Sequence, residues 1–194
     1  MTLTELLFGV GTLLREFGQR HPNSRYNPSM PLSGHLRELR KKVGNDLLVL
    51  PSAAVAIYDE QGRVLMGLHS DRKVWVMPGG LVEPEEIPAD AAIREVWEET
   101  GLLVELTNIL GVYGGRELVV DYVNGDRASY VGVIFRGRIT GGQLRADAEE
   151  ILDVRYISRA ELKELPHARW LDIALDSIYA QNGPADFQKS TWRP

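Results

Sequence analysis

The chain has no cysteine among its 194 residues. Disulfide bonds and zinc sites built from thiolates are therefore excluded, because both need cysteine sulfur. A reducing compartment is compatible with this absence. The first residues also lack the basic start of a secretory signal, and Glu5 lies among them. We therefore expect a cytoplasmic location.

The chain also lacks long apolar runs and an excess of positive charge. No apolar stretch approaches the roughly 20 residues that a membrane-spanning helix needs. The 22 Lys and Arg residues are outnumbered by 27 Asp and Glu residues, which gives a formal charge of −5. An acidic chain without a long basic segment is a poor general binder of nucleic acid. We expect neither a membrane nor a nucleic acid as partner, and a small molecule as substrate.

An acidic helix is predicted over residues 88–100. Its first residue is proline, whose missing N–H has no helical partner at that position, and Gly101 suits the position after the helix end. Glu95, Glu98 and Glu99 are spaced i, i+3 and i+4, which places three carboxylates on one face. Like charges at this spacing repel each other, so the pattern favours a bound cation such as Mg²⁺ or Mn²⁺.

This helix belongs to a longer pattern over residues 80–102. The pattern reads Gly, five residues, Glu, seven residues, and then Arg-Glu-aliphatic-any-Glu-Glu-any-Gly-aliphatic. A chance match to all these positions is on the order of one in 10^9 per window, or rarer. The pattern resembles the box of the Nudix hydrolases, the MutT-like pyrophosphohydrolases, and every specified position is filled. The resemblance covers roughly residues 47–180.

The resemblance implies metal-dependent hydrolysis of a phosphoanhydride bond in a nucleoside diphosphate linked to a second moiety, X. The cofactor would be Mg²⁺ or Mn²⁺. The expected metal ligands are the carbonyl oxygen of Gly79 and the carboxylates of Glu95, Glu98 and Glu99. Arg94 is expected to pair with Glu86, and these two residues would hold the preceding loop against the helix as structural parts of the catalytic site.

The general base is less sharply defined by the pattern. Glu98 is the first choice, because it lies within the box. A later acidic segment offers further candidates, for which a solvated acidic loop is the competing interpretation: Glu149, Glu150 and Asp153. Sequence does not supply the pKa that a base must have to act near neutral pH.

The substrate remains open at this point, among nucleotide sugars, ADP-ribose, dinucleoside polyphosphates and CDP-alcohols. Some subfamilies carry a Pro or a Tyr downstream of the box, but residues 116–122 contain no Pro, and Tyr122 comes late for the second mark. Several side chains have the chemistry to stack on a base or contact phosphate, although packing is the competing interpretation: Trp75, Tyr113, Tyr122, Tyr130 and Arg116.

Three other functions compete with this hypothesis. The chain could hydrolyse non-standard nucleoside triphosphates to remove them. It could also be a non-catalytic Nudix-like regulator that senses a nucleotide, although such proteins often have an eroded box. An isoprenoid diphosphate isomerase is disfavoured, since the familiar enzymes of that type use a catalytic cysteine.

The order of elements predicts an α/β (α+β) fold, because strands come first and helices lie in the middle and at the end. The resemblance implies a Nudix-like α/β/α sandwich with a mixed β-sheet. We divide the chain into an N-terminal helical extension (1–46), a Nudix hydrolase domain (47–182) and a C-terminal tail (183–194). The strands are expected at 48–58, 63–69, 74–77, 103–113, 116–123, 129–140 and 152–157, and helices outside the box at 34–43, 158–165 and 167–180.

The extension contains leucines at helical spacing, which predict an amphipathic helix over residues 2–17. This helix could pack on its own domain or form a contact between two copies, so a homodimer is an expectation. The shorter helix at 34–43 is basic, and we expect its charges to face solvent.

Overall fold

The computed structural model of the protein describes residues 33–122, 124–180 and 183–193. The expected amphipathic helix at 2–17 lies outside this part of the chain. The strands are β1 (Leu48–Ile57), β2 (Val64–His69), β3 (Trp75–Val76), β4 (Gly79–Leu81), β5 (Leu102–Tyr113), β6 (Val119–Asp121), β7 (Arg127–Gly142), β8 (Ile151–Ile157) and β9 (Asp186–Phe187). The helices are α2 (Gly34–Val43), α3 (Pro88–Thr100), α4 (Arg159–Glu164) and α5 (Leu171–Ala180), with a 3₁₀ turn η1 (Arg116–Leu118).

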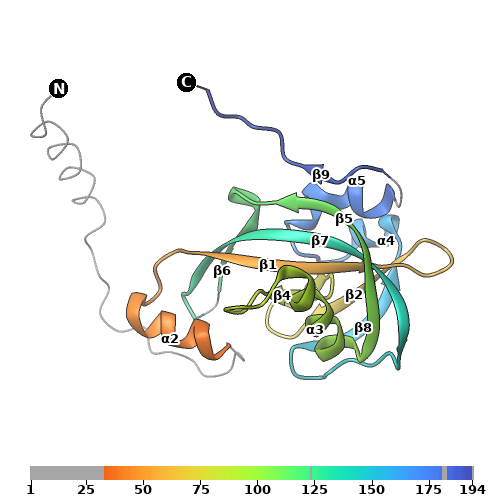
Figure 1. Cartoon of the computed structure of the whole chain (residues 1–194), viewed down its shortest axis with the longest axis horizontal. Helices are drawn as coiled ribbons and strands as arrows, with labels where there is room; N and C mark the ends of the chain where they lie inside the picture. Colours follow the sequence, from red (N-terminus) through yellow and green to blue (C-terminus); the bar gives the residue numbers. More distant parts are fainter. Residues whose placement is uncertain (1–32, 123, 181–182, 194) are drawn as a thin grey trace, which may run out of the picture.

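Two sheets form the centre of the described structure (Figure 1). The larger sheet has the order β4-β1-β7-β5-β9, with β6 paired to β7, and the smaller has the order β3-β2-β8. Strand β1 runs parallel to β7, and β5 runs parallel to β9, whereas β4 is antiparallel to β1 and β5 is antiparallel to β7. The expected mixed sheet is therefore confirmed.

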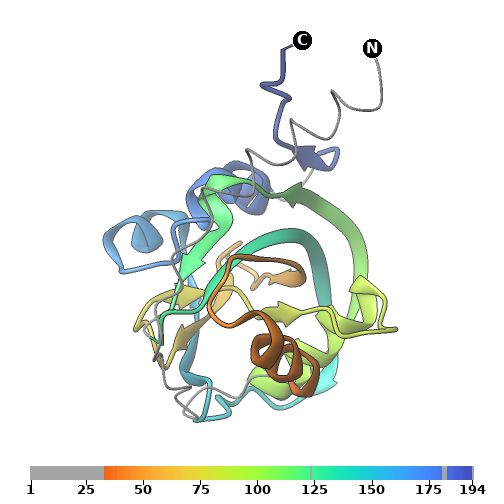
Figure 2. The same ribbon diagram turned by 90° about the vertical axis from the view of Figure 1, so that its left-hand side faces the viewer.

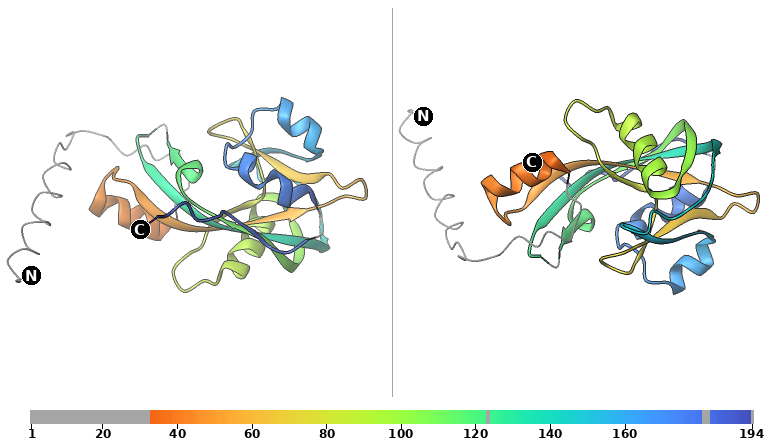
Figure 3. Two further views of the ribbon diagram at one scale, coloured as in Figure 1. Left: turned by 90° about the horizontal axis from the view of Figure 1, so that it is seen from above. Right: turned by 90° about the horizontal axis from the view of Figure 1, so that it is seen from below.

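The second half of β1, residues 53–57, is apolar on both faces, and both of these faces are covered. Val55 and Ile57 pack with residues of α3 and β5, while Ala56 belongs to a second core with α4 and α5. A strand buried on both sides appears in sequence as a nearly continuous apolar run, as residues 53–57 do. Helix α3 lies on one side of the larger sheet, and α4 and α5 lie on the other (Figure 3). The α/β/α sandwich predicted from the sequence is thus confirmed.

Several predicted boundaries are wrong where long-range contacts decide the structure. The strand expected at 116–123 begins instead with η1, and within the described residues 116–122 the strand comprises Val119–Asp121. The last helix begins at Leu171, because His167 forms a β-bridge with Trp75. In the segment expected as a tail, β9 pairs with β5, and the Tyr113 hydroxyl donates to Asp186 Oδ2 at 2.9 Å.

Helix α2 packs against the starts of β1 and β7. Its charges face solvent as expected at Arg37, Lys41 and Lys42, whereas the expectation is wrong for Arg40. Leu36 forms a small core with Leu50 and Ala128. The Arg40 side chain is buried and donates to the backbone carbonyls of Gly44, Asp46 and Arg127. Figure 2 shows α2 in front of the curved sheet at this end of the molecule. Among the described helices, none is both long and apolar enough to cross a membrane.

Candidate active site

Helix α3 is oriented by its apolar side, which packs on the larger sheet. Pro88 is its first residue, and Gly101 ends it in the left-handed conformation with φ of 68°. Ala91, Ala92 and Val96 are fully buried against residues of β1 and β5. Because these contacts fix the rotation of the helix, the glutamates at 95 and 99 are turned toward β4.

Glu99 is the most buried of the box carboxylates. It is only 5% exposed, and its Oε2 accepts a hydrogen bond from the Gly79 backbone N–H at 3.1 Å. Burial, followed by the negative charge of Glu95, raises the pKa of Glu99 well above its ordinary value. No cation of the described chain pairs with it, so a negative charge at this position is costly without an added cation.

The two glycines of β4 allow the backbone to approach these carboxylates closely. A Cβ on Gly79, whose φ is 152°, would lie 2.3 Å from the Ala53 carbonyl oxygen. A Cβ on Gly80 would lie 2.5 Å from Glu95 Oε1. Neither position has room for a side chain in the present arrangement, which explains the Gly-Gly pair in physical terms.

Arg94 forms ion pairs with three carboxylates of the site. Its Nε and one terminal nitrogen donate to both oxygens of Glu86 at 2.9 and 3.0 Å, and the same nitrogen also reaches the Leu81 carbonyl. The expected ion pair with Glu86 is therefore present, and its hydrogen bond is the main cause that raises the pKa of Arg94. The sequence did not predict the two further pairs, in which Arg94 binds Glu95 at 2.8 Å and Glu98 at 3.0 Å.

The three box glutamates differ in their exposure although they share one face. The side chain of Glu98 is 54% exposed, whereas that of Glu95 is 13% exposed. Burial raises the pKa of Glu95, and its bond to Arg94 opposes that rise. Among these three glutamates, Glu98 is thus the one that water reaches most easily, while the protein largely buries Glu95 and Glu99.

Glu150 is brought to the same site by the loop between β7 and β8. The Asp147 carboxylate organises this loop by accepting hydrogen bonds from three successive backbone N–H groups, those of residues 149–151. Burial, and then the charges of Glu95 and Asp147, raise the pKa of Glu150 to about 7. Of the three later base candidates, Glu150 lines the cavity, while Glu149 and Asp153 are exposed and do not.

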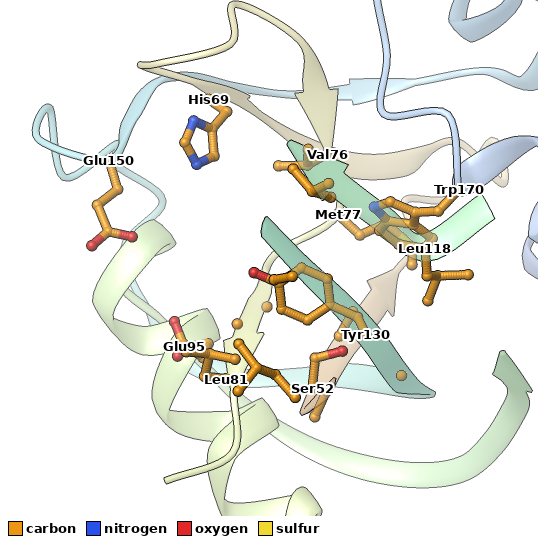
Figure 4. Close-up of a pocket in the computed structure, with 18 of the residues that line it drawn as sticks. Ser52, His69, Val76, Met77, Leu81, Glu95, Leu118, Tyr130, Glu150 and Trp170 are labelled. Atoms are coloured by element: carbon orange, nitrogen blue, oxygen red, sulfur yellow. The ribbon is translucent and has the colours of Figure 1, made fainter. Parts of the chain in front are cut away.

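These groups line a cavity of about 410 Å³ that has two chemically different ends. The box glutamates and Glu150 form the acidic end, and apolar and aromatic side chains form the other (Figure 4). The apolar end includes Met77, Leu118, Tyr130 and Trp170, with the Ser52 hydroxyl beside them. Such a cavity suits a ligand with a charged part and a flat or apolar part.

The aromatic candidates from the sequence fall into two groups. Tyr113, Tyr122 and Tyr130 line the cavity, and the hydroxyl groups of Tyr122 and Tyr130 are joined by a hydrogen bond of 2.5 Å. Trp75 is instead buried in the core with the Arg155 guanidinium over its ring, and Arg116 is exposed outside the cavity. Sequence reasoning missed other lining residues, which share no motif: Ser33, Leu36, His69, Arg72, Met77 and Trp170.

The acidic end fits a hard divalent cation by its chemistry. Carboxylate oxygens are the ligands that Mg²⁺ and Mn²⁺ prefer, and the buried Glu99 carboxylate has no cationic partner. Within the described residues, no three acidic or imidazole groups already form a closed cage for a metal. Arg94 holds the carboxylates of Glu95 and Glu98, so a cation here would compete with Arg94 for them.

A model of the NUDIX domain matches residues 49–177 of this chain. Among curated proteins, a "MutT-like protein" of Streptomyces ambofaciens is 33% identical over 113 residues, covering 58% of this chain and 66% of the relative. A "Putative 8-oxo-dGTP diphosphatase" of Bacillus subtilis (strain 168) is 34% identical over 110 residues, which cover 57% of this chain and 67% of the relative. The chain thus spans about two thirds of the length of these two relatives.

A solved structure described as a UDP-X diphosphatase has the same fold. It superposes with a TM-score of 0.59 and covers 95% of this chain and 84% of its own. The two sequences are 15% identical, so this likeness concerns the fold alone.

Proposed function

Because the chain belongs to the NUDIX family, we propose that it is a metal-dependent pyrophosphohydrolase acting on a nucleoside diphosphate linked to a second moiety, X. The observation that carries this proposal is the cavity with two ends. Its acidic end, made by Glu95, Glu98, Glu99 and Glu150, suits a pyrophosphate with its cation, and its apolar end suits an organic group.

Several residues of the box would bind the cation together. Glu95, Glu98 and Glu99 would bind Mg²⁺ or Mn²⁺ together with the carbonyl oxygen of Gly79. When bound, the ion neutralises charge on the phosphate oxygens and stabilises the leaving phosphate. The Gly79 N–H holds Glu99 in place, since it is the hydrogen-bond donor to that carboxylate.

The remaining residues position groups or move a proton. Glu98 is our first choice for the base that takes a proton from water, because it is the exposed carboxylate of the box. Glu150 is the second choice, since it lines the cavity and its pKa of about 7 suits a base at neutral pH. Arg94 and Glu86 are positioning residues, because Arg94 ties the loop before α3 to two of the box carboxylates.

The names of the similar proteins point to different substrates. One solved neighbour is described as a UDP-X diphosphatase, which favours a nucleotide sugar or a similar conjugate. The Bacillus subtilis relative is named for 8-oxo-dGTP, which favours a second candidate, the hydrolysis of a damaged nucleoside triphosphate. Both reactions break a phosphoanhydride bond and differ in what leaves: phosphorylated X in the first and pyrophosphate in the second.

A substrate panel with product identification tests the proposal. The panel should contain UDP-sugars, ADP-ribose, CDP-alcohols, dinucleoside polyphosphates and 8-oxo-dGTP, each with Mg²⁺, with Mn²⁺ and with a chelator. We expect cation-dependent release of a nucleoside monophosphate from at least one of them. Folded protein that binds a nucleotide derivative but turns none over would overturn the proposal and favour the non-catalytic regulator. The homodimer and the cytoplasmic location remain predictions.

A further inference from the structure

The turn between β2 and β3 places a positive charge in the cavity that forms no ion pair with a described residue. Arg72 lines the cavity, and its Nε is buried without a hydrogen-bond partner. Within the described residues, the Arg72 side chain forms neither a hydrogen bond nor an ion pair. Its neighbour Asp71 forms no hydrogen bond with it, and the buried Asp71 Oδ2 also lacks a partner.

The other arginines of the cavity are already occupied. Arg40 donates from its two terminal nitrogens to three backbone carbonyls. Its buried Nε also lacks a hydrogen bond, but it forms an ion pair with Asp126 at 3.6 Å. Arg94 binds three carboxylates and a carbonyl. Arg72 therefore differs from both, because its donors are not used by the folded chain.

The backbone holds this turn in a defined conformation. The His69 N–H donates to the Val74 carbonyl at 2.9 Å, and the Lys73 N–H donates to the His69 carbonyl at 3.0 Å. The Asp71 N–H donates to His69 Nδ1 at 3.2 Å, and Lys73 has a left-handed φ of 53°. Arg72 is thus presented by a turn with its own hydrogen bonds.

The positive charge of Arg72 affects the pKa of two residues that line different sides of the cavity, His69 and Tyr130. Burial lowers the pKa of His69, and Arg72 lowers it further. Burial also raises the pKa of the Tyr130 phenol, and the charges of Arg72 and Arg40 oppose that rise. In Figure 4, His69 and Tyr130 both border the open space, with Glu150 and Glu95 at its acidic edge.

A buried guanidinium donor without a partner is costly, and a guanidinium matches the geometry of phosphate oxygens. We propose that Arg72 binds a phosphate oxygen of the substrate. This inference rests on the proposed function. In this arrangement Arg72 and the cation at the box would hold the pyrophosphate from two directions, and Arg72 would act in binding and orientation without taking part in proton transfer.

The test uses methylene bisphosphonate, an uncleaved mimic of pyrophosphate, and measures its Kd with the full chain by calorimetry at saturating Mg²⁺. The variants are Arg72→Gln and Arg72→Lys, with Lys73→Asn as the control. The control removes the same charge one residue away, from an exposed side chain outside the cavity, and asparagine tolerates a left-handed φ.

We expect Arg72→Gln to weaken binding about 10- to 100-fold and Arg72→Lys to weaken it less, because lysine keeps the charge but loses the planar fork. Lys73→Asn should bind as the original chain does. With a substrate from the panel, Arg72→Gln should raise KM much more than it lowers kcat. Equal affinity in Arg72→Gln, or equal weakening in Lys73→Asn, would overturn the inference. Because the binding assay needs no turnover, it separates failure of this inference from failure of the proposed function.

Discussion

Gly80 and Glu95 are in such close proximity that a methyl group at position 80 would lie 2.5 Å from Glu95 Oε1. The obstructing atoms belong to the end of a flexible side chain, so Gly80→Ala should displace the carboxylate and leave the fold intact. We expect kcat/KM to fall about 10- to 100-fold, since small misplacements at a reacting centre have large effects, and the Mg²⁺ concentration for half-maximal activity to rise. Gly114→Ala is the control, because its Cβ would meet nothing closer than 3.7 Å. Equal activity in the two variants would contradict the proposed role of Glu95 as a metal ligand.

Substitution of Glu98 tests the assignment of the general base. Glu98→Gln keeps the shape of an exposed side chain and removes its ability to take a proton. We expect kcat to fall by about 10²- to 10⁴-fold with little change in Tm. Glu85→Gln removes a charge from an exposed residue outside the cavity and should remain fully active. Near-normal turnover in Glu98→Gln would remove Glu98 from the mechanism and direct attention to Glu150.

Arg94 connects the loop before α3 to the box carboxylates, and lysine cannot replace it. Lysine has no planar fork with which to bind both oxygens of Glu86 while also reaching Glu95 and Glu98. We expect Arg94→Lys to lower the free energy of unfolding by about 1–2 kcal/mol, measured in urea, and to lower kcat/KM as well. Arg138→Lys is the control, since the Arg138–Glu105 pair is exposed and should tolerate the change. Full activity in Arg94→Lys would show that this network does not position the site.

Arg40 attaches α2 to the rest of the structure. Arg40→Met leaves three backbone carbonyls without their buried donor and Asp126 without its ion-pair partner at 3.6 Å. We expect a loss of about 3 kcal/mol, which corresponds to a Tm decrease of about 6–12 °C for a chain of this size. Lys41→Met alters an exposed neighbour and should change Tm little. Equal Tm values for the two variants would contradict the role of Arg40 in stabilising the contact of α2 with β7.

The raised pKa of Glu150 predicts a pH-dependent stability in the presence of a chelator. In the folded chain the pKa is about 7, so the folded state binds the proton more tightly than the unfolded state does. The stabilisation from this proton is complete below the ordinary pKa of a glutamate, and it is lost as the pH rises through about 7. Urea unfolding of the original chain should therefore show a larger loss of stability from pH 5 to pH 8 than Glu150→Gln shows. Parallel profiles for the two proteins would mean that Glu150 titrates normally.

The local features of the site were predictable from the sequence because they depend on neighbours along the chain. The bounds of α3 follow from Pro88 and Gly101, and the spacing of Glu95, Glu98 and Glu99 follows from helix geometry. The pair of Arg94 with Glu86 was also expected, and it is present. The two further partners of Arg94, at positions 95 and 98, were not expected, because hydrogen-bond geometry depends on side-chain conformation.

Other features were not predictable because they depend on segments that are distant in sequence. Nothing in the basic segment 34–43 indicates that Arg40 is buried against β7, and nothing near Trp75 indicates that Arg155 lies over its ring. Arg72 belongs to no motif, and only the folding of β2 toward the box places it in the cavity.

The sequence by itself therefore determined the family pattern and the acidic helix, because these depend on residue identity and helical spacing, and the resemblance to the family implied the kind of bond that is broken. The tertiary structure decided which carboxylates are buried, that Glu150 rather than Glu149 or Asp153 lines the cavity, and that α2 and Arg72 form part of its wall. The physical reason is that burial and electrostatic coupling are properties of groups brought together in space, and the pairing of β1 with β7 and of β2 with β8 is what brings these groups together.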